Sequence, residues 1–382
     1  SASGITTTGA TILNDIESLP HGLLFWRSST HYIGGLGVVV FMMMILPSVG
    51  MVRFRMSKME ITDISKTNFR YRSNKLIRVL ITVYLAITVL SFIALMLAGM
   101  SPFDAINHSF SVTATGGFST RNLSIGAYDS PLIEFVLMLF MVISTIHLGL
   151  LYASFASRSA RVFRDPVTRF YLTTILVSIV LVTLSLMLGG GEQNALQALR
   201  KGAFSVVTTI STTGFAISDT SGWPILAILI LFYVSIQCGC SGSTSSGVRS
   251  DRMFLIFKGV RVQIIKMAHP NAVVQVKSGG QVVDKELLSS VYTYLFLYLF
   301  LAFVGAVIYA MTGMGLMESV SSSISMMSNI GPAFGEYGSM SSFADAPQIA
   351  KFLMGVQMIV GRLGLYPVLL LFTLFRKNVR WQ

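Results

Sequence analysis

Four short stretches of this sequence combine hydroxyl side chains with glycine between long apolar runs. They read GITTTGAT at 4–11, TATGGFSTRN at 113–122, ISTTGFAIS at 210–218 and MSNIGPAFGE at 327–336. Glycine permits backbone angles that other residues avoid. Backbone carbonyl oxygens arranged around one axis can replace the hydration water of a cation. The stretches therefore predict a cation site made of main-chain oxygens, in which no carboxylate is needed.

Short amphipathic segments at 102–113, 193–208 and 316–328 precede three of these stretches. A helix of about 12 residues is about 18 Å long, which is too short to cross a bilayer. Its C-terminal end would carry unsatisfied carbonyls and the negative end of the helix dipole into the membrane. The alternative is that the Ser/Thr/Gly runs are ordinary extracellular loops. Repetition of the same arrangement in register favours re-entrant half-helices.

The composition indicates a helical membrane protein. The chain has 382 residues, of which 53% are hydrophobic and 12% charged, and its mean hydropathy is +0.70. Soluble domains carry about 25% charged residues. The apolar runs are near 20 residues long and continuous, as in membrane helices rather than in barrel strands. A soluble helical protein with an apolar core is the alternative that these values disfavour.

The positive charge is confined to particular segments. The net charge is +12, and most Lys and Arg residues lie in 51–78, 158–169, 249–285 and 376–380. Each segment follows an apolar run, which is the positive-inside pattern of cytoplasmic loops. The charge is therefore explained by topology, and no nucleic-acid partner is expected.

The stretches also mark an internal repeat. Gly9, Gly116, Gly214 and Gly331 recur with a period near 100 residues. Spanning helices are expected near 30–50, 77–99, 131–155, 168–188, 223–238, 288–312 and 347–375. The repeats are assigned to 1–52 (pore loop and second helix only), 76–157, 166–260 and 287–382. Because the chain begins inside the first stretch, the first repeat is expected to be N-terminally incomplete.

Two features interrupt the apolar helices. The sequence QCGCSGSTSSGVR at 237–249 is too rich in glycine and serine for a regular helix, so a loop on the cytoplasmic side of the cation site is expected. It lacks the G-K-[ST] ending of a phosphate-binding loop. Arg362 lies mid-way along an apolar run, where arginine is costly and usually functional. Snorkelling or a structural salt bridge is the alternative role for Arg362.

The motifs TTTGAT, GGFST, STTGF and SNIGPAFG resemble, in this order, the four pore-loop signatures of the Trk/Ktr superfamily of potassium-translocating subunits, and are most similar to those of the TrkH type. The resemblance covers the whole chain. It implies an all-α polytopic membrane protein with four non-identical helix–pore loop–helix repeats around a pseudo-fourfold pore. It also implies a K+ selectivity filter and a gate. The filter residues would be Thr7, Thr8, Gly9, Thr115, Gly116, Thr213, Gly214, Asn329, Ile330 and Gly331. The gate would comprise Gly239, Gly242, Ser243, Ser245, Gly247 and Arg362, with Arg362 as an electrostatic barrier.

The same resemblance implies partners and a location. The family forms homodimers in the bacterial plasma (inner) membrane and pairs with a cytosolic nucleotide-binding ring, TrkA-like or KtrA-like. Membrane lipid surrounds the chain, K+ is the transported ion, and no bound organic cofactor is expected. Gly364 stands where TrkH-type chains usually carry glutamate, and the spelling GRLG is more similar to the Ktr branch. The branch therefore stays open.

Two other functions compete with a passive pore. A transporter coupling K+ to Na+ or protons would need broken helices in paired repeats, and the sequence shows one clearly broken helix. A membrane enzyme would need an acid/base or metal cluster, but the five histidines are scattered without a motif. Asp104 and His108 are expected to cap and pack behind the filter, and Arg121 is expected to be structural at the outer mouth.

Overall fold

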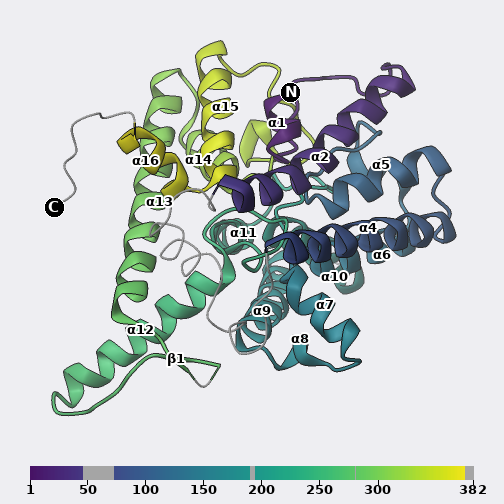
Figure 1. Cartoon of the computed structure of the whole chain (residues 1–382). Helices are drawn as coiled ribbons and strands as arrows, with labels where there is room; N and C mark the ends of the chain where they lie inside the picture. Colours follow the sequence, from purple (N-terminus) through teal and green to yellow (C-terminus); the bar gives the residue numbers. More distant parts are fainter. Residues whose placement is uncertain (46–72, 190–193, 280, 375–382) are drawn as a thin grey trace.

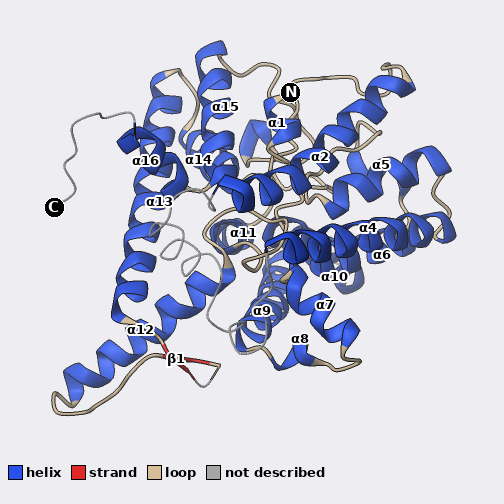
Figure 2. Cartoon of the chain, in the orientation of Figure 1, coloured by secondary structure: helices blue, strands red, loops and turns tan. Residues whose placement is uncertain are grey.

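The computed structural model describes residues 1–45, 73–189, 194–279 and 281–374, and the described chain is mostly helical (Figures 1 and 2). Within these residues, three helices are long and apolar enough to cross a membrane. They are α4 (Ser73–Leu97, through its part Ile77–Leu97), α9 (Pro166–Leu188) and α13 (Lys285–Met311). The predicted cytoplasmic segment 376–380, and residues 51–72 of the predicted cytoplasmic segment 51–78, lie outside the described residues.

Half-length helices follow the spanning helices. They are α5 (Pro102–Thr113), α10 (Ala195–Ile210) and α14 (Leu316–Ser328), and each packs on the spanning helix before it. A short helix, α1 (Ala2–Ile5), takes the corresponding place at the start of the chain. Ser101 caps α5 by accepting a hydrogen bond from the Asp104 N–H at 3.1 Å, and Pro102 begins the helix. The half-helices therefore lie where the amphipathic segments predict them, within two residues.

In each repeat a second helix follows the polar Ser/Thr/Gly stretch, and most of these second helices are more broken than the sequence indicates. These second helices are α2 (His21–Ile45), α6 (Pro131–Thr145) with α7 (Leu148–Ala156), α11 (Ile225–Gln237) with α12 (Ser250–Ala268), and α15 (Gln348–Leu363) with α16 (Leu365–Leu374). The expectation of continuous helices over 131–155 and 347–375 is wrong. The expectation that only the helix before 237–249 is broken is therefore wrong as well.

Tertiary contacts and a glycine explain the two unexpected breaks. Between α6 and α7 the chain bends by 98°. His147 caps α7 by accepting from Gly149 N, and Leu148 N donates to the carbonyl of Gly242 at 3.1 Å, far along the chain. At the other break, Gly364 has a φ of +82°, which ends α15.

The repeats follow one another around a closed circuit. Helix α2 packs on α5, α10 packs on α6, and α11 packs on α14. The circuit closes because α15 packs on α1 and α2, so the first and last parts of the chain are neighbours (Figure 1). The remaining elements are peripheral: η3 (Ser124–Tyr128), α8 (Arg161–Arg164), η4 (Gly335–Tyr337) and a hairpin of β1 (Lys277–Ser278) and β2 (Gln281–Val282).

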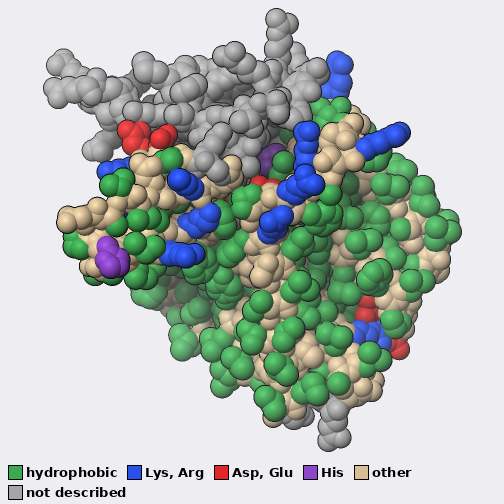
Figure 3. Space-filling model, turned by 90° about the horizontal axis from the view of Figure 1, so that it is seen from below, with side chains coloured by type: hydrophobic (Ala, Val, Ile, Leu, Met, Phe, Trp, Pro, Cys, Tyr) green, Lys and Arg blue, Asp and Glu red, His purple; other side chains and the backbone are tan. Residues whose placement is uncertain are grey.

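Large apolar side chains cover much of the outer surface. Leu176 on α9, Phe303 on α13 and Phe135 on α6 are 66%, 66% and 59% exposed. Figure 3 shows an apolar face with Lys and Arg side chains gathered along one side of it. Exposed apolar side chains in this number are expected where a protein surface contacts lipid rather than water.

Candidate cation site

The four half-helices end in the same backbone motif. Just beyond the last residue or the cap of each helix, one residue has a left-handed conformation, and its N–H bonds to the carbonyl three residues back. These residues are Thr7 (φ 52°), Thr115 (53°), Thr212 (57°) and Asn329 (57°). Their hydrogen bonds are Thr7 N to Gly4 O (3.0 Å), Thr115 N to Val112 O (3.2 Å), Thr212 N to Thr209 O (3.0 Å) and Asn329 N to Met326 O (3.4 Å). A β-branched residue with positive φ is rare and strained, which is typical of a functional position.

The next residue in each segment makes a second shared hydrogen bond, to the carbonyl five residues back. These bonds are Thr8 N to Ser3 O (2.9 Å), Gly116 N to Ser111 O (2.8 Å), Thr213 N to Thr208 O (3.0 Å) and Ile330 N to Ser325 O (3.0 Å). The two bonds together form a Schellman motif, which stops the helix and turns the chain sharply. We call residues 7–9, 115–117, 212–214 and 329–331 the ring segments.

A glycine with positive φ ends every ring segment. The four are Gly9 (82°), Gly117 (80°), Gly214 (80°) and Gly331 (104°). The second segment therefore has Gly117, not Gly116, at the position equivalent to the other three glycines. Gly116 occupies the middle position, and its carbonyl lies against Gly9. The sequence-based set includes Thr115 and Gly116 of this segment but takes Gly116 as the filter glycine and omits Gly117, and it also omits Thr212, the equivalent of Thr7.

The ring segments contact one another in order. A β-carbon on the last glycine of each segment would collide with the middle carbonyl oxygen of the next segment. The pairs are Gly9 with Gly116, Gly117 with Thr213, Gly214 with Ile330, and Gly331 with Thr8. Because the fourth pair returns to the first segment, the contacts close a ring. Only glycine fits these positions, both for space and for the backbone angle.

Carbonyl oxygens of the ring segments are left without backbone partners. In the described chain, none of the first two carbonyls of any ring segment accepts a backbone hydrogen bond. Buried backbone carbonyls are nearly always paired, so this set requires a ligand or water. Above the ring lies a cavity of about 160 Å³, whose lining includes all four terminal glycines. The cavity gives an ion a route to these oxygens.

Side chains behind the ring hold its backbone in place. Asn329 Nδ2 donates to Thr8 Oγ1 at 2.9 Å and to the carbonyl of Met358 at 2.8 Å. His108 lies 2.7 Å from the Asp104 carbonyl and 3.0 Å from Ser119 Oγ, through its two ring nitrogens. Its contacts are the packing contacts expected of it from the sequence.

Arg121 lies at the outer mouth in an ion-pair network. Its guanidinium is 3.6 Å from the carboxylate of Asp104 and 3.7 Å from that of Glu17. A side-chain hydrogen bond with Tyr128, together with these carboxylates, raises the pKa of Arg121. Arg121 is therefore a structural residue, as the sequence indicates.

The segment between α11 and α12 folds into a buried loop directly beneath the ring. Thr115 Oγ1, in the second ring segment, lies 3.1 Å from the Thr244 carbonyl in this loop and 2.7 Å from the Ala114 carbonyl, and its one proton is shared between these two acceptors. Gly242 and Gly247 have φ values of 73° and 78°, and Gly242 packs against the ring of His147. The interrupted helix predicted at 237–249 is thus observed. Thr244, which touches both the ring and Arg362, was not predicted.

Arg362, at the end of α15, is tied to this loop. Its Nη1 donates to the Thr244 carbonyl at 2.6 Å and to Ser246 Oγ at 3.2 Å, and Nη2 contacts the Gly35 carbonyl at 3.5 Å. The residue is 7% exposed. Among the described residues no carboxylate lies within 4.0 Å of it, so its charge is solvated by backbone and hydroxyl oxygens. Snorkelling is excluded by this burial.

The other predicted gate residues contact one another within the loop. Gly239 packs on Ser245, and Gly247 packs on Cys238. The hydroxyls of Ser243 and Ser245 share a hydrogen bond of 2.8 Å. They stabilise the loop itself, whereas Thr244 and Ser246 contact Arg362. The described residues contain no group of three or more His, Cys, Asp or Glu side chains placed to hold a metal ion.

Apolar helices, half-length helices and a ring of carbonyls without backbone partners are typical of a helical membrane transport protein. Residues 1–380 match the model of the TrkH family, described as a cation transport protein. The chain belongs to the TrkH family, and it is a transport protein rather than an enzyme.

Relatives agree over nearly the whole chain. It is 34% identical to the Trk system potassium uptake protein TrkH of Salmonella typhimurium, over 98% of this chain and 77% of the relative. It is 34% identical to the Trk system potassium uptake protein TrkG of Escherichia coli, with the same coverage. Its structure matches the crystal structure of the potassium transporter TrkH from Vibrio parahaemolyticus with a TM-score of 0.85 and 30% identity, over 97% of this chain and 76% of the other.

Proposed function

We propose that this chain takes up K+ across the bacterial inner membrane through a selectivity filter formed by the ring segments. The observation that carries the proposal is the ring of main-chain carbonyls without backbone partners, which lies under a cavity lined by four glycines. Such oxygens replace the hydration shell of a cation. The relatives' names, which refer to potassium uptake, support K+ as the ion.

The pore is a pseudo-fourfold assembly of the four repeats. The circuit of helix contacts and the cyclic order of glycine–carbonyl contacts support this arrangement. Each half-helix directs the negative end of its dipole at the ring, which favours a cation there. With one left-handed glycine per segment, the filter is short, and its discrimination between K+ and related alkali ions is expected to be weak.

The loop between α11 and α12 and Arg362 form the gate. The loop lies under the ring, and a guanidinium beside it raises the energy of a cation in the same passage. Conduction then requires the Thr244 carbonyl to leave both Thr115 and Arg362. The breaks at His147 and Gly364 lie beside this loop, so α7 and α16 are placed to move with it.

Regulation comes from outside the chain in this proposal. A cytosolic nucleotide-binding ring, TrkA-like or KtrA-like, docks on the basic cytoplasmic segments and moves the loop, and two copies of the chain form a homodimer. Exposed Arg and Lys side chains on α8 and α12, such as Arg164, Arg261 and Lys266, support a docking role. Their charge is also explained by topology alone.

Flux of K+ into liposomes tests the proposal, with Arg362→Ala as the variant and the exposed Arg164→Ala as the matched control. Passive, K+-selective flux that rises in Arg362→Ala and is unchanged in Arg164→Ala supports the filter and the barrier. If flux occurs only when a sodium or proton gradient is supplied, an ion-coupled transporter replaces the passive pore.

A further inference from the structure

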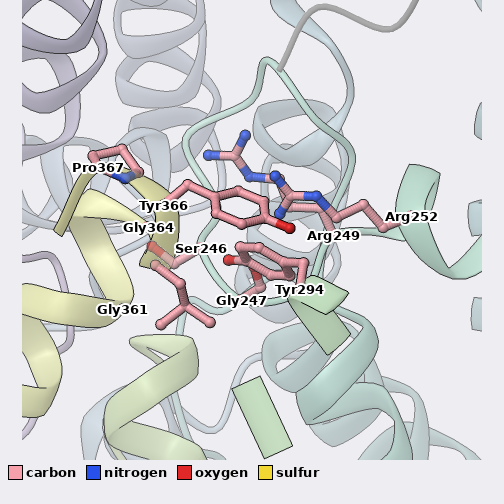
Figure 4. Close-up of a pocket in the computed structure, with 10 residues that line it drawn as sticks. Ser246, Gly247, Arg249, Arg252, Tyr294, Gly361, Gly364, Tyr366 and Pro367 are labelled. Atoms are coloured by element: carbon pink, nitrogen blue, oxygen red, sulfur yellow. The ribbon is translucent and has the colours of Figure 1, made fainter. Parts of the chain in front are cut away.

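A second cavity lies where the loop, the helices α12 and α13, and the junction of α15 and α16 meet (Figure 4). Its volume is about 20 Å³. Ser246 and Gly247 contribute from the loop, Arg249 and Arg252 from the start of α12, and Tyr294 from α13. Gly361, Gly364 and Tyr366 contribute from the junction of α15 and α16. The proposed function gives this cavity no role.

Two arginines face the cavity without a counter-charge. Arg252 is only 7% exposed, and its guanidinium carbon lies 3.8 Å from the centre of the Tyr294 ring. Its Nη1 donates to the Val248 carbonyl at 3.3 Å, and Arg249 Nη1 donates to Ser241 Oγ at 3.3 Å. In the part of the chain that the structure describes, no carboxylate lies within 4.0 Å of either guanidinium. The neighbouring Asp251 is occupied elsewhere, where it accepts from Ser241 N at 2.9 Å.

This arrangement is unfavourable unless an anion completes it. Both arginines line this cavity together with Tyr294 and Tyr366 (Figure 4). Like charges that share a partly dehydrated site repel each other, and burial of an uncompensated charge is costly. A bound anion would screen the repulsion between the two guanidinium groups and would compensate the buried charge.

We propose that this pocket binds the phosphate group of an anion from the cytoplasmic side. Arginine presents paired N–H donors that match phosphate oxygens. The cavity of about 20 Å³ has room for about one water-sized group, so it would admit one oxygen of a phosphate held at its mouth and excludes a nucleotide base. The source is either free inorganic phosphate or the headgroup of an anionic phospholipid, which the amphipathic helix α12 would meet at the membrane surface.

Binding would hold the gate in the observed arrangement. The pocket joins the loop to α13 and to the α15–α16 junction, and Tyr294 Oη also lies 3.5 Å from the Gly247 carbonyl. An anion shared by these elements stabilises the loop beneath the ring, so it lowers ion flux. This regulatory step rests on the proposed function, whereas anion binding itself does not.

Thermal unfolding of the purified full-length chain tests binding without measuring transport. Inorganic phosphate is titrated at constant ionic strength, and in a second arm the chain is placed in phosphatidylcholine vesicles with or without phosphatidylglycerol. The variants are Arg252→Gln and the more exposed Arg249→Gln, and the control is Arg261→Gln, which removes an exposed charge from the same helix. Saturating ligand is expected to raise the Tm of the wild type and of Arg261→Gln by about 2 °C or more.

The pocket variants should bind at least about tenfold more weakly, because each loses charge-assisted hydrogen bonds. Stabilisation by phosphate supports a free anion, and stabilisation by phosphatidylglycerol alone supports a lipid headgroup. Equal responses in the wild type, Arg252→Gln and Arg249→Gln, or no response to either ligand, would overturn the proposal. Liposome flux then reports regulation separately: a binding response without lower flux rejects the gating step alone.

Discussion

Replacement of Gly117 by alanine is the most direct test of the ring, because the chain contains a matched control. Gly117 and Gly99 both have positive φ, 80° and 97°. A β-carbon at Gly117 would collide with the Thr213 carbonyl oxygen, whereas one at Gly99 would meet nothing within 4 Å. The two substitutions therefore share the backbone strain and differ in the collision.

The structure sets the size of each effect. Alanine in the left-handed region costs about 1–2 kcal/mol at either position. At Gly117 the collision adds about 1–3 kcal/mol, as in other overpacked sites. That energy is relieved by displacement of the Thr213 carbonyl, which is one of the oxygens assigned to the ion. Gly117→Ala should therefore lose K+ over Na+ selectivity, or flux altogether, and Gly99→Ala should lose only stability.

The assay combines thermal unfolding with K+ and Na+ flux in liposomes, normalised to the amount of folded protein. Normalisation matters because both variants are expected to be less stable than the wild type. Wild-type selectivity and flux in Gly117→Ala would refute the assignment of this residue to the ring. A loss of selectivity in Gly99→Ala would also refute the reasoning, because backbone strain far from the ring would then be sufficient to abolish selectivity without a collision.

Two further substitutions test the loop and the scaffold. Thr115→Val removes the hydroxyl that the Thr244 and Ala114 carbonyls share, so the contact with the loop is worth at most about 1 kcal/mol and flux should rise at most about fivefold. Thr113→Val is the control, because its buried hydroxyl has no partner in the described chain, and it should leave flux unchanged. Equal flux in both variants would contradict the contact. Arg200→Gln removes the guanidinium that lies 2.7 Å from the buried Glu134 carboxylate, so it should lower the free energy of unfolding by about 3 kcal/mol in chemical denaturation. The double variant Arg200→Gln, Glu134→Gln should recover most of that loss, because the buried charge is then gone. No recovery would show that the unpaired charge is not the cause.

The amphipathic half-helices could be predicted because their positions follow from local patterns. Period and length identify 102–113 and 316–328, and the structure has helices over the same residues. The register of the second ring segment could not be predicted in the same way. Gly116 and Gly117 are adjacent, and only the backbone angles show which of them takes the left-handed position.

Contacts between distant parts of the chain explain the other misses. The sequence near Ile146 and His147 remains apolar, and the break there depends on the Gly242 carbonyl, which arrives from another repeat. Thr244 is one hydroxyl among several in its loop, and its importance comes from contacts with Thr115 and Arg362. The local sequence contains neither signal.

The four ring segments belong to a single chain, and this has a consequence for heredity. In a ring of identical subunits, one altered codon changes every quadrant at once. Here each codon changes one quadrant, and three different sequences already occur: TTG in the first and third segments, TGG in the second and NIG in the fourth. Selection can therefore adjust one side of the ring while the other three are preserved. The same property offers the experimenter a dosage series, with one, two, three or four altered quadrants in molecules of fixed stoichiometry.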